Sequence, residues 1–218
     1  MEKKLKVIAL GEIVWDCLPA GRQLGGAPLN FAFFAKELGA DAYAVSAVGN
    51  DPLGDETLEV AAKTCVDLSY VQRNDLPTSR VLVTLDENGI PQYEIVEGVA
   101  WDAIECTDSA LALVKDASVL CWGSLAQRSE KTRQSALALI QAAPASCVKV
   151  FDINIRQHYY SREVIVESLK MADILTKKIE RYKDSEGRTQ TTETTIFSGL
   201  FAKIEISKSI ENDKNISG

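Results

Sequence analysis

The chain has 218 residues, of which 46% are hydrophobic and 25% charged, a composition typical of a globular protein with a buried core. Its formal net charge of -7 argues against nucleic acid as a partner, because phosphate backbones are bound by clustered lysine and arginine. No apolar run is long enough to cross a membrane, and no signal peptide precedes the first strand-like stretch. We therefore expect a cytoplasmic protein with no membrane partner.

The cysteines and the single histidine give no pattern of metal ligands. Five cysteines occur without a CxxC spacing, and His158 lies at no familiar spacing from them. Most of the cysteines fall in apolar runs, as small buried side chains do. The sequence therefore predicts reduced thiols and no structural metal.

The first third of the chain alternates between strand-like and helix-like segments. Residues 5–11 form an apolar run that ends in glycine, and residues 43–48 form a second one. A helix is predicted over 30–38, with Gly39 as its C-terminal cap, and another begins at Asn50-Asp51-Pro52. The apolar face of the first helix is predicted to contain Phe31, Phe34, Ala35 and Leu38.

Residues 79–96 interrupt this order with two alternating segments joined by Asn88-Gly89, a hairpin signal that predicts a lid or a small second sheet. The strand and helix alternation then resumes up to about Leu175. Strand, helix, strand order favours a parallel sheet covered on both faces. The later elements are predicted as strands over 118–122 and 149–153, helices over 129–142 and from Ser161, and a further strand from Ala172.

The composition changes in the last part of the chain. In residues 176–218, 11 of the 43 residues are hydrophobic and 11 are serine or threonine. One interpretation is a solvated terminal extension. The other is a tail that was never selected to fold with the rest of the chain.

Polar residues at the ends of predicted strands are the candidates for ligand binding. Gly25 and Gly26 let the backbone approach a ligand, and Asn30 can donate to and accept from a hydroxyl. Asp16, just past the first strand, offers a carboxylate that suits a polyol. A tight turn capped by Asn30 and a surface acid in a loop are the alternative interpretations.

A second group of polar residues follows the strand at 149–153. Arg156 provides a rigid, permanently charged guanidinium group that suits a phosphate or a sugar oxygen. Asn154 lies two residues before it. An ion pair of Arg156 with Asp152 or Asp173 is the alternative. All of these candidates fall at the same edge of the predicted sheet, where open α/β sheets bind ligands.

Four motifs together carry a family resemblance. They are Gly-Glu-x-x-x-Asp at 11–16, Gly-Gly-Ala-x-x-Asn-x-Ala at 25–32, Val-Gly-Asn-Asp-x-x-Gly at 48–54 and Phe-Asp-x-Asn-x-Arg at 151–156. In order and spacing, the chain resembles the ribokinase-like carbohydrate kinases of the PfkB family, most of all the bacterial fructokinases. The resemblance covers about residues 5–175.

The resemblance implies a three-layer α/β/α sandwich with a small β lid, incomplete at its C-terminal end. Residues 1–175 would be the N-terminal part of the kinase domain, with the lid at about 13–18 and 79–96, and 176–218 a poorly ordered tail unrelated to the family. It also implies ATP-dependent phosphorylation of a sugar hydroxyl, with ATP and Mg²⁺ as cofactors, fructose as substrate and a homodimer formed through the lid.

The resemblance also assigns roles to single residues. Asp16, Gly25, Gly26 and Asn30 would hold the sugar hydroxyls, while Asn154 and Arg156 would lie near the acceptor hydroxyl and the incoming phosphate. Tyr93 and Trp101 are further candidates for lid contacts with the sugar, and core packing is the alternative for each.

One signature of the family does not occur in these 218 residues. The family's C-terminal segment resembles Asp-Thr-x-Gly-Ala-Gly-Asp, and no Gly-Ala-Gly-Asp is present. Its glycines open a helix that holds the transferring phosphate, and its last aspartate is the catalytic base, so no catalytic residue is assigned here. A shifted reading frame after codon 175 would explain this absence and the change in composition together. The sequence therefore predicts a sugar kinase by descent that is inactive as written, or alternatively a non-catalytic sugar-binding or interaction module.

Overall fold

The computed structural model describes residues 4–18, 21–85, 91–176, 180–183 and 189–192. The chain divides into two compact units, Met1–Lys178 and Ile179–Gly218. In the second unit, β11 (Glu180–Lys183) and β12 (Thr189–Thr192) form an antiparallel pair. All residues proposed above for the site belong to the first unit.

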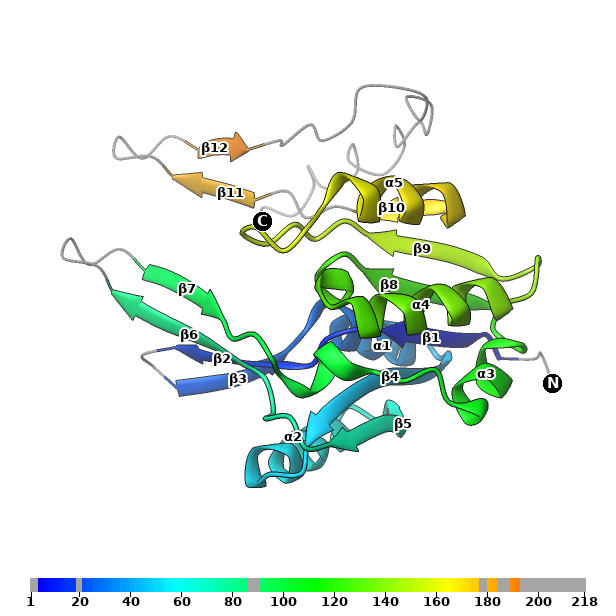
Figure 1. Ribbon diagram of the computed structural model, residues 1–218, viewed down its shortest axis with the longest axis horizontal. Helices are drawn as coiled ribbons and strands as arrows, with labels where there is room; N and C mark the ends of the chain where they lie inside the picture. The colour runs from blue at the N-terminus through cyan, green and yellow to red at the C-terminus, as the bar shows by residue number, and fades with distance from the viewer. Residues whose placement is uncertain (1–3, 19–20, 86–90, 177–179, 184–188, 193–218) are drawn as a thin grey trace, which may run out of the picture. The chain divides into compact units, whose positions relative to one another are not determined.

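A six-stranded sheet forms the centre of the first unit (Figure 1). Every neighbouring pair in it is parallel, so all the strands end at the same edge. In spatial order the strands are β10 (Ile174–Thr176), β9 (Val148–Asp152), β8 (Val119–Gly123), β1 (Lys6–Leu10), β4 (Asp41–Gly49) and β5 (Asp67–Asn74).

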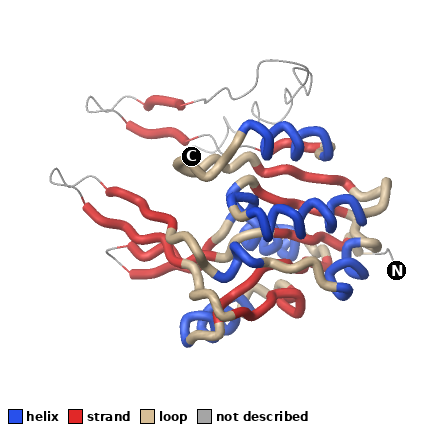
Figure 2. The backbone as a smooth tube through the Cα atoms, viewed as in Figure 1, coloured by secondary structure: helices blue, strands red, loops and turns tan. Residues whose placement is uncertain are grey.

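Helices cover both faces of this sheet, which confirms the predicted α/β/α layers. Figure 2 shows the red strands between two sets of blue helices. On one face lie α3 (Asp108–Val114), α4 (Glu130–Ala142) and α5 (Arg162–Met171); on the other lie α1 (Ala27–Glu37) and α2 (Pro52–Ala62). Two short 3₁₀ helices, η1 (Ala100–Ala103) and η2 (Leu125–Arg128), precede α3 and α4. None of the helices that the structure describes has the length and apolar character needed to span a membrane.

Side-chain caps fix where two of the helices begin. Asp51 caps α2 by accepting a hydrogen bond from the Gly54 amide, and Ser161 caps α5 by accepting one from the Val164 amide. Such caps satisfy amides that have no partner within the helix. Both helix starts agree with the sequence prediction.

The lid sheet, defined here as β2, β3, β6 and β7, is the second sheet that the hairpin signal predicted. Its order is β3 (Gly21–Gly25), β2 (Val14–Leu18), β6 (Arg80–Leu85) and β7 (Pro91–Ile95). The β6–β7 pair is antiparallel, and β2 pairs with β6 in parallel. The predicted turn at Asn88-Gly89 lies outside the described residues.

The structure corrects the prediction for α1. The helix begins at Ala27 with Gly26 as its N-cap, so Asn30 lies inside the helix rather than capping it. Phe34 and Leu38, predicted on the apolar face, are exposed by 63% and 89%, while the buried residues are Pro28, Leu29 and Ala32. Gly39 follows the helix with φ +91°, as expected for a residue just past a helix end.

Several elements of the first unit have no counterpart in the sequence prediction, namely β3, β5, α3 and the two 3₁₀ helices. The segment of β5 mixes exposed and half-buried residues, because β5 is an edge strand and has no continuous apolar run. Cys65 follows α2 as an exposed residue with φ 57°, whereas Cys121 and Cys147 are buried.

Candidate functional site

The carboxyl ends of β1, β8 and β9 bring the candidate polar residues to one edge of the sheet. Glu12 follows β1, Gly123 ends β8 and Asp152 ends β9. The chain leaves β1 at this edge and continues through β2 and β3 of the lid sheet into the N-terminus of α1 (Figure 1). This is the edge at which open α/β sheets place ligands.

Asp16 lies on β2 and faces the end of the neighbouring strand β3. A Cβ atom added at Gly25 would stand 3.2 Å from Asp16 Oδ2, so the absent side chain leaves the carboxylate room beside the backbone. The Asp16 side chain is half-buried. The structure therefore places the Asp16 carboxylate directly beside the glycine pair.

Gly26 makes the closest backbone approach in the site. It has φ +114°, and a Cβ there would stand only 2.4 Å from the carbonyl oxygen of Glu12, a distance that no side chain can occupy. Asn30 follows one turn later and is exposed. Its backbone amide donates to the Gly26 carbonyl oxygen at 3.0 Å. The turn at Gly26 therefore leads directly into the first turn of α1.

Asn154 and Arg156 lie in the segment after β9, and both are half-buried. Asn154 Oδ1 is buried and has no hydrogen-bond partner among the described residues, while its backbone oxygen accepts from Ser124 Oγ at 3.2 Å. The charge of Arg156 acts on both Asp152 and Glu12. Asp173, the other partner considered for Arg156, accepts from the backbone amide of Lys149 at 2.8 Å.

The two lid candidates differ in position. Tyr93 lies on β7, opposite Val83 of β6, and its side chain is outside the described part of the chain. Trp101 lies in η1 and is fully buried, with the Arg128 guanidinium 4.0 Å from its ring centre. The packing of Trp101 is that of a core residue.

Glu12 is a buried acid that sequence reasoning did not single out. Its side chain is 2% exposed, and its Oε2 has no partner among the described residues. Burial raises the pKa of Glu12 to about 7, helped by the charge of Asp152 and opposed by hydrogen bonds from the backbone amides of Glu12 and Ala27 and by the charge of Arg156. The signal available in the sequence is an acid between two runs of apolar residues, at 7–10 and 13–15.

The raised pKa of Glu12 makes the free energy of unfolding depend on pH. Below about pH 4.5 the carboxyl is protonated in both states; between pH 4.5 and about 7 only the folded state keeps the proton. Stability should therefore fall as the pH rises through this window, by about 3 kcal/mol in total. Urea unfolding across this range should show the loss in the natural chain and not in Glu12→Gln. An equal pH dependence in both chains would contradict the assignment.

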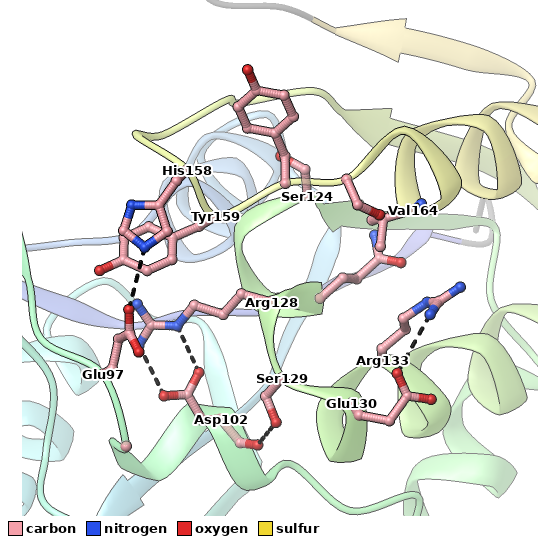
Figure 3. Close-up of a pocket in the computed structure, with 14 residues that line it drawn as sticks. Glu97, Asp102, Ser124, Arg128, Ser129, Glu130, Arg133, His158, Tyr159 and Val164 are labelled. Carbon is pink, nitrogen blue, oxygen red and sulfur yellow. Dashed lines mark hydrogen bonds and ion pairs between the residues drawn. The ribbon is translucent and has the colours of Figure 1, made fainter.

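Arg128, at the end of η2, joins three parts of the first unit. Its guanidinium donates to both carboxylate oxygens of Asp102 at 2.8 Å each (Figure 3). It also donates to the carbonyl oxygen of Val96 at 2.7 Å. The ring of Tyr159 lies 4.8 Å from it, and the Tyr159 hydroxyl donates to the carbonyl oxygen of Ile95 at 3.0 Å. The end of the lid strand β7 is thereby tied to η1 and to the segment after β9.

A pocket of about 640 Å³ opens beside this cluster. Figure 3 shows its walls, which come from the segment after β7, the starts of α4 and α5 and the segment after β9. None of the six residues predicted to bind the sugar and phosphate lines it. The arginines in its walls are already matched by acids: Arg128 by Asp102, and Arg133 by Glu130 and Glu167. We assign the pocket no ligand.

Comparisons with known proteins agree with the motifs. The family model described as "pfkB family carbohydrate kinase" matches residues 10–196. The match extends past Leu175, where the resemblance read from the sequence stops. The position of the domain boundary stays a prediction.

Two relatives match over most of this chain. The uncharacterized sugar kinase PH1459 of Pyrococcus horikoshii is 26% identical over 171 residues, which are 75% of this chain and 55% of the relative. Fructokinase-2 of Zea mays is 27% identical over 189 residues, covering 78% of this chain and 56% of the relative. The chain thus spans a little over half the length of these relatives.

Solved structures show the same fold. The structure of PH1459 in complex with ATP has a TM-score of 0.67 at 26% identity, over 78% of this chain and 62% of that one. A fructokinase from Xylella fastidiosa has a TM-score of 0.67 at 21% identity, over 78% of this chain and 58% of that one. The motifs, the lid sheet beside a parallel sheet and the family match all agree, and the chain belongs to the pfkB family of carbohydrate kinases.

Proposed function

We propose that this chain carries the sugar-binding half of an ATP-dependent sugar kinase site, with fructose as the sugar. Asp16, Gly25, Gly26 and Asn30 hold the sugar hydroxyls. The observation that carries the proposal is the Asp16 carboxylate beside the Gly25–Gly26 turn at the start of α1. An ionised carboxylate accepts from two hydroxyls, and the glycines let the sugar approach the backbone closely.

The acceptor side of the site belongs to the segment after β9. Asn154 offers a buried amide oxygen without a partner among the described residues, suited to accept from a hydroxyl. Arg156 offers a permanent positive charge for an incoming phosphate. In this arrangement both residues serve the hydroxyl that receives the phosphate.

Fructose is favoured over other sugars by the relatives that match most of the chain. A fructokinase of Zea mays is among the sequence relatives and fructokinases are among the structural neighbours. Shorter segments match an ATP-dependent 6-phosphofructokinase and a fructosamine kinase. The names of both proteins also refer to fructose or to its amine derivative. The choice of fructose rests on these names.

ATP and Mg²⁺ are the cofactors that the family implies. Beyond α5, the described residues supply β10, β11 and β12, and none of these is a glycine-rich helix start of the kind that holds a transferring phosphate. No group of three His, Cys, Asp or Glu side chains able to hold a metal ion occurs among the described residues. The described residues therefore do not fit a complete nucleotide site, and we derive no phosphoryl-transfer step from them.

A non-catalytic sugar-binding module is the second candidate function. The 218 residues contain the sugar-side motifs and no Gly-Ala-Gly-Asp segment, which is the pattern such a module would have. Both candidates require the same sugar site. Neither candidate predicts turnover by these 218 residues, and they differ in whether a chain restored in frame past Leu175 phosphorylates the sugar.

Fructose should protect the chain against thermal unfolding, and Asp16→Ala should abolish that protection. Removing a charged hydrogen-bond partner costs about 1.5–3 kcal/mol, which is about a 10- to 100-fold loss of affinity. The measurement is the melting temperature of each chain with and without fructose. Glu59→Ala, an exposed acid on α2, is the matched control and should respond as the natural chain does. A fructose response that survives in Asp16→Ala would remove Asp16 from the site.

A further inference from the structure

The lid strand β2 is attached to α2 by a buried hydrogen bond. Trp15 Nε1 donates to Thr57 Oγ1 at 2.8 Å, and the two residues are 4% and 0% exposed. The Thr57 hydroxyl in turn donates to the carbonyl oxygen of Leu53, one turn earlier in α2, at 2.6 Å. An indole N–H can only donate, and a hydroxyl that has given its proton can still accept. The two hydrogen bonds therefore fix each other's direction and join the lid sheet to a helix that covers the six-stranded sheet.

The motif at 48–54 attaches the start of α2 to a second lid strand, β6. The Asp51 carboxylate accepts from the backbone amide and the hydroxyl of Thr78, two residues before β6, at 2.8 and 2.7 Å. Burial alone would raise the pKa of Asp51, but the hydrogen bonds from Thr78 and Gly54 outweigh it and lower the pKa. A Cβ atom at Gly54 would overlap the carbonyl oxygen of Gly49, so this turn requires glycine. The first turn of α2 is therefore held at a defined place beside β6.

Holding Trp15 against α2 determines where Asp16 lies. Successive residues of a strand face opposite sides of the sheet, so Asp16 is on the face of β2 that points away from α2. Val14 shares that face, and its partner on β3 is Gly25. A Cβ atom at Gly25 would stand 3.2 Å from Asp16 Oδ2, which places the carboxylate on the same face. The anchoring of one residue therefore sets the position of the next.

A second contact between the lid sheet and α2 lies at the surface. Arg22 of β3 donates to both carboxylate oxygens of Glu56, and its guanidinium stands 5.1 Å from the ring centre of Trp15. The side chains of Arg22 and Glu56 are 50% and 36% exposed, so solvent screens the ion pair and weakens it. The bond between Trp15 and Thr57 is buried and is not weakened in this way.

We propose that Trp15 and Thr57 are positioning residues of the sugar site: their hydrogen bond holds β2 against α2 and so keeps the Asp16 carboxylate beside the Gly25–Gly26 turn. The proposal rests on the proposed sugar site, and neither residue contacts the sugar itself. A binding group works only when it is held within about 0.5 Å of its place, and the residues behind it provide that precision. Without the bond, part of the binding free energy of fructose would be used to order the strand.

The test is the affinity for fructose, measured by calorimetry, in variants that remove this one hydrogen bond. Trp15→Phe keeps an aromatic ring and loses the donor, and Thr57→Val keeps the shape and loses the acceptor. Each should bind fructose about three- to tenfold more weakly than the natural chain, the change that corresponds to one neutral hydrogen bond. The double variant should bind no more weakly than the single ones, because both changes remove the same bond. Thr57→Ser keeps the hydroxyl and should bind as the natural chain does.

Trp122→Phe is the matched control. It removes another buried indole hydrogen bond, from Trp122 Nε1 of β8 to Ser168 Oγ of α5 at 3.3 Å, which involves no residue of the lid sheet. It should lower the melting temperature and leave the fructose affinity of the folded chain unchanged. If Trp15→Phe and Thr57→Val also lower only the melting temperature, the pair is structural and the proposal is wrong. A Thr57→Ser chain that binds as weakly as Thr57→Val would contradict it too.

Hydrogen exchange decides the case if the natural chain does not bind fructose, a result that would remove the sugar site and not the anchoring. Without sugar, the backbone amides of β2 and β3 in Thr57→Val should exchange about three- to tenfold faster than in the natural chain, because a local contact is lost. The amides of β1 and β8 should exchange as before, and Thr57→Ser should restore the slow exchange in the lid sheet. Unchanged exchange in β2 and β3 would overturn the anchoring, as would an equal increase in both sheets. Trp15→Phe gives the same comparison if Thr57→Val does not fold.

Discussion

The purified 218-residue chain is expected to transfer no phosphate from ATP to fructose, ribose or 2-keto-3-deoxygluconate above background. The segment that would supply the base and the phosphate-holding amides does not occur in these residues. Losing a general base costs about 10²–10⁴ in rate, and losing anion-stabilising donors costs about 10²–10³. The nucleotide would also rarely be aligned with the sugar, because the described residues form no complete site for it.

An ATP-coupled assay measures this result, with a complete fructokinase as the positive control. The same assay on a chain restored in frame past Leu175 should show turnover with one of the three sugars. Clear phosphorylation by the 218-residue chain, lost in Arg156→Ala, would show that catalysis uses groups other than those proposed here.

Arg128→Ala is expected to lower the free energy of unfolding by about 3–5 kcal/mol, because it leaves the Asp102 carboxylate buried without its partner. The side chains of this pair are only 6% and 11% exposed. The change also removes the hydrogen bond to the Val96 carbonyl oxygen and the contacts with the rings of Trp101 and Tyr159. Urea unfolding of the two chains gives the difference.

Arg73→Ala is the matched control for this prediction. Arg73 also pairs with an aspartate, Asp55, at 2.6 Å, but those side chains are 36% and 73% exposed. Solvent screens such a pair, so its loss should cost about 0–1 kcal/mol. Equal losses in the two variants would mean that the Arg128 cluster contributes no more than an ordinary surface ion pair.

Much of the order of elements along the chain could be predicted because those elements are encoded locally. Apolar runs with terminal glycines marked β1 and β4, and Asp51 and Ser161 marked helix starts through caps within three residues. The alternating hairpin segments predicted the lid sheet for the same reason, since a strand's two faces follow from alternation along the chain. Local signals failed at β5, an edge strand without a continuous apolar run, and at the short helix α3.

The description of the candidate site needed both the sequence and the tertiary structure. Asp16, Gly26 and Arg156 could be chosen from the sequence because strand ends in a parallel sheet meet at one edge. The burial of Glu12 and the contacts of Arg128 could not, because the groups involved lie far away in the chain. The charges of Asp152 and Arg156 act on Glu12, and Arg128 donates to Asp102 and Val96.

By itself, then, the sequence determined the α/β order, the lid sheet and the edge at which the polar residues gather, since periodicity, caps and turns act within a few residues. Only the tertiary structure decided which face of α1 is buried, with Phe34 exposed and Ala32 inside. It alone showed that the acid at position 12 is enclosed. Burial and the pKa of a buried group are set by neighbours that packing brings from distant parts of the chain.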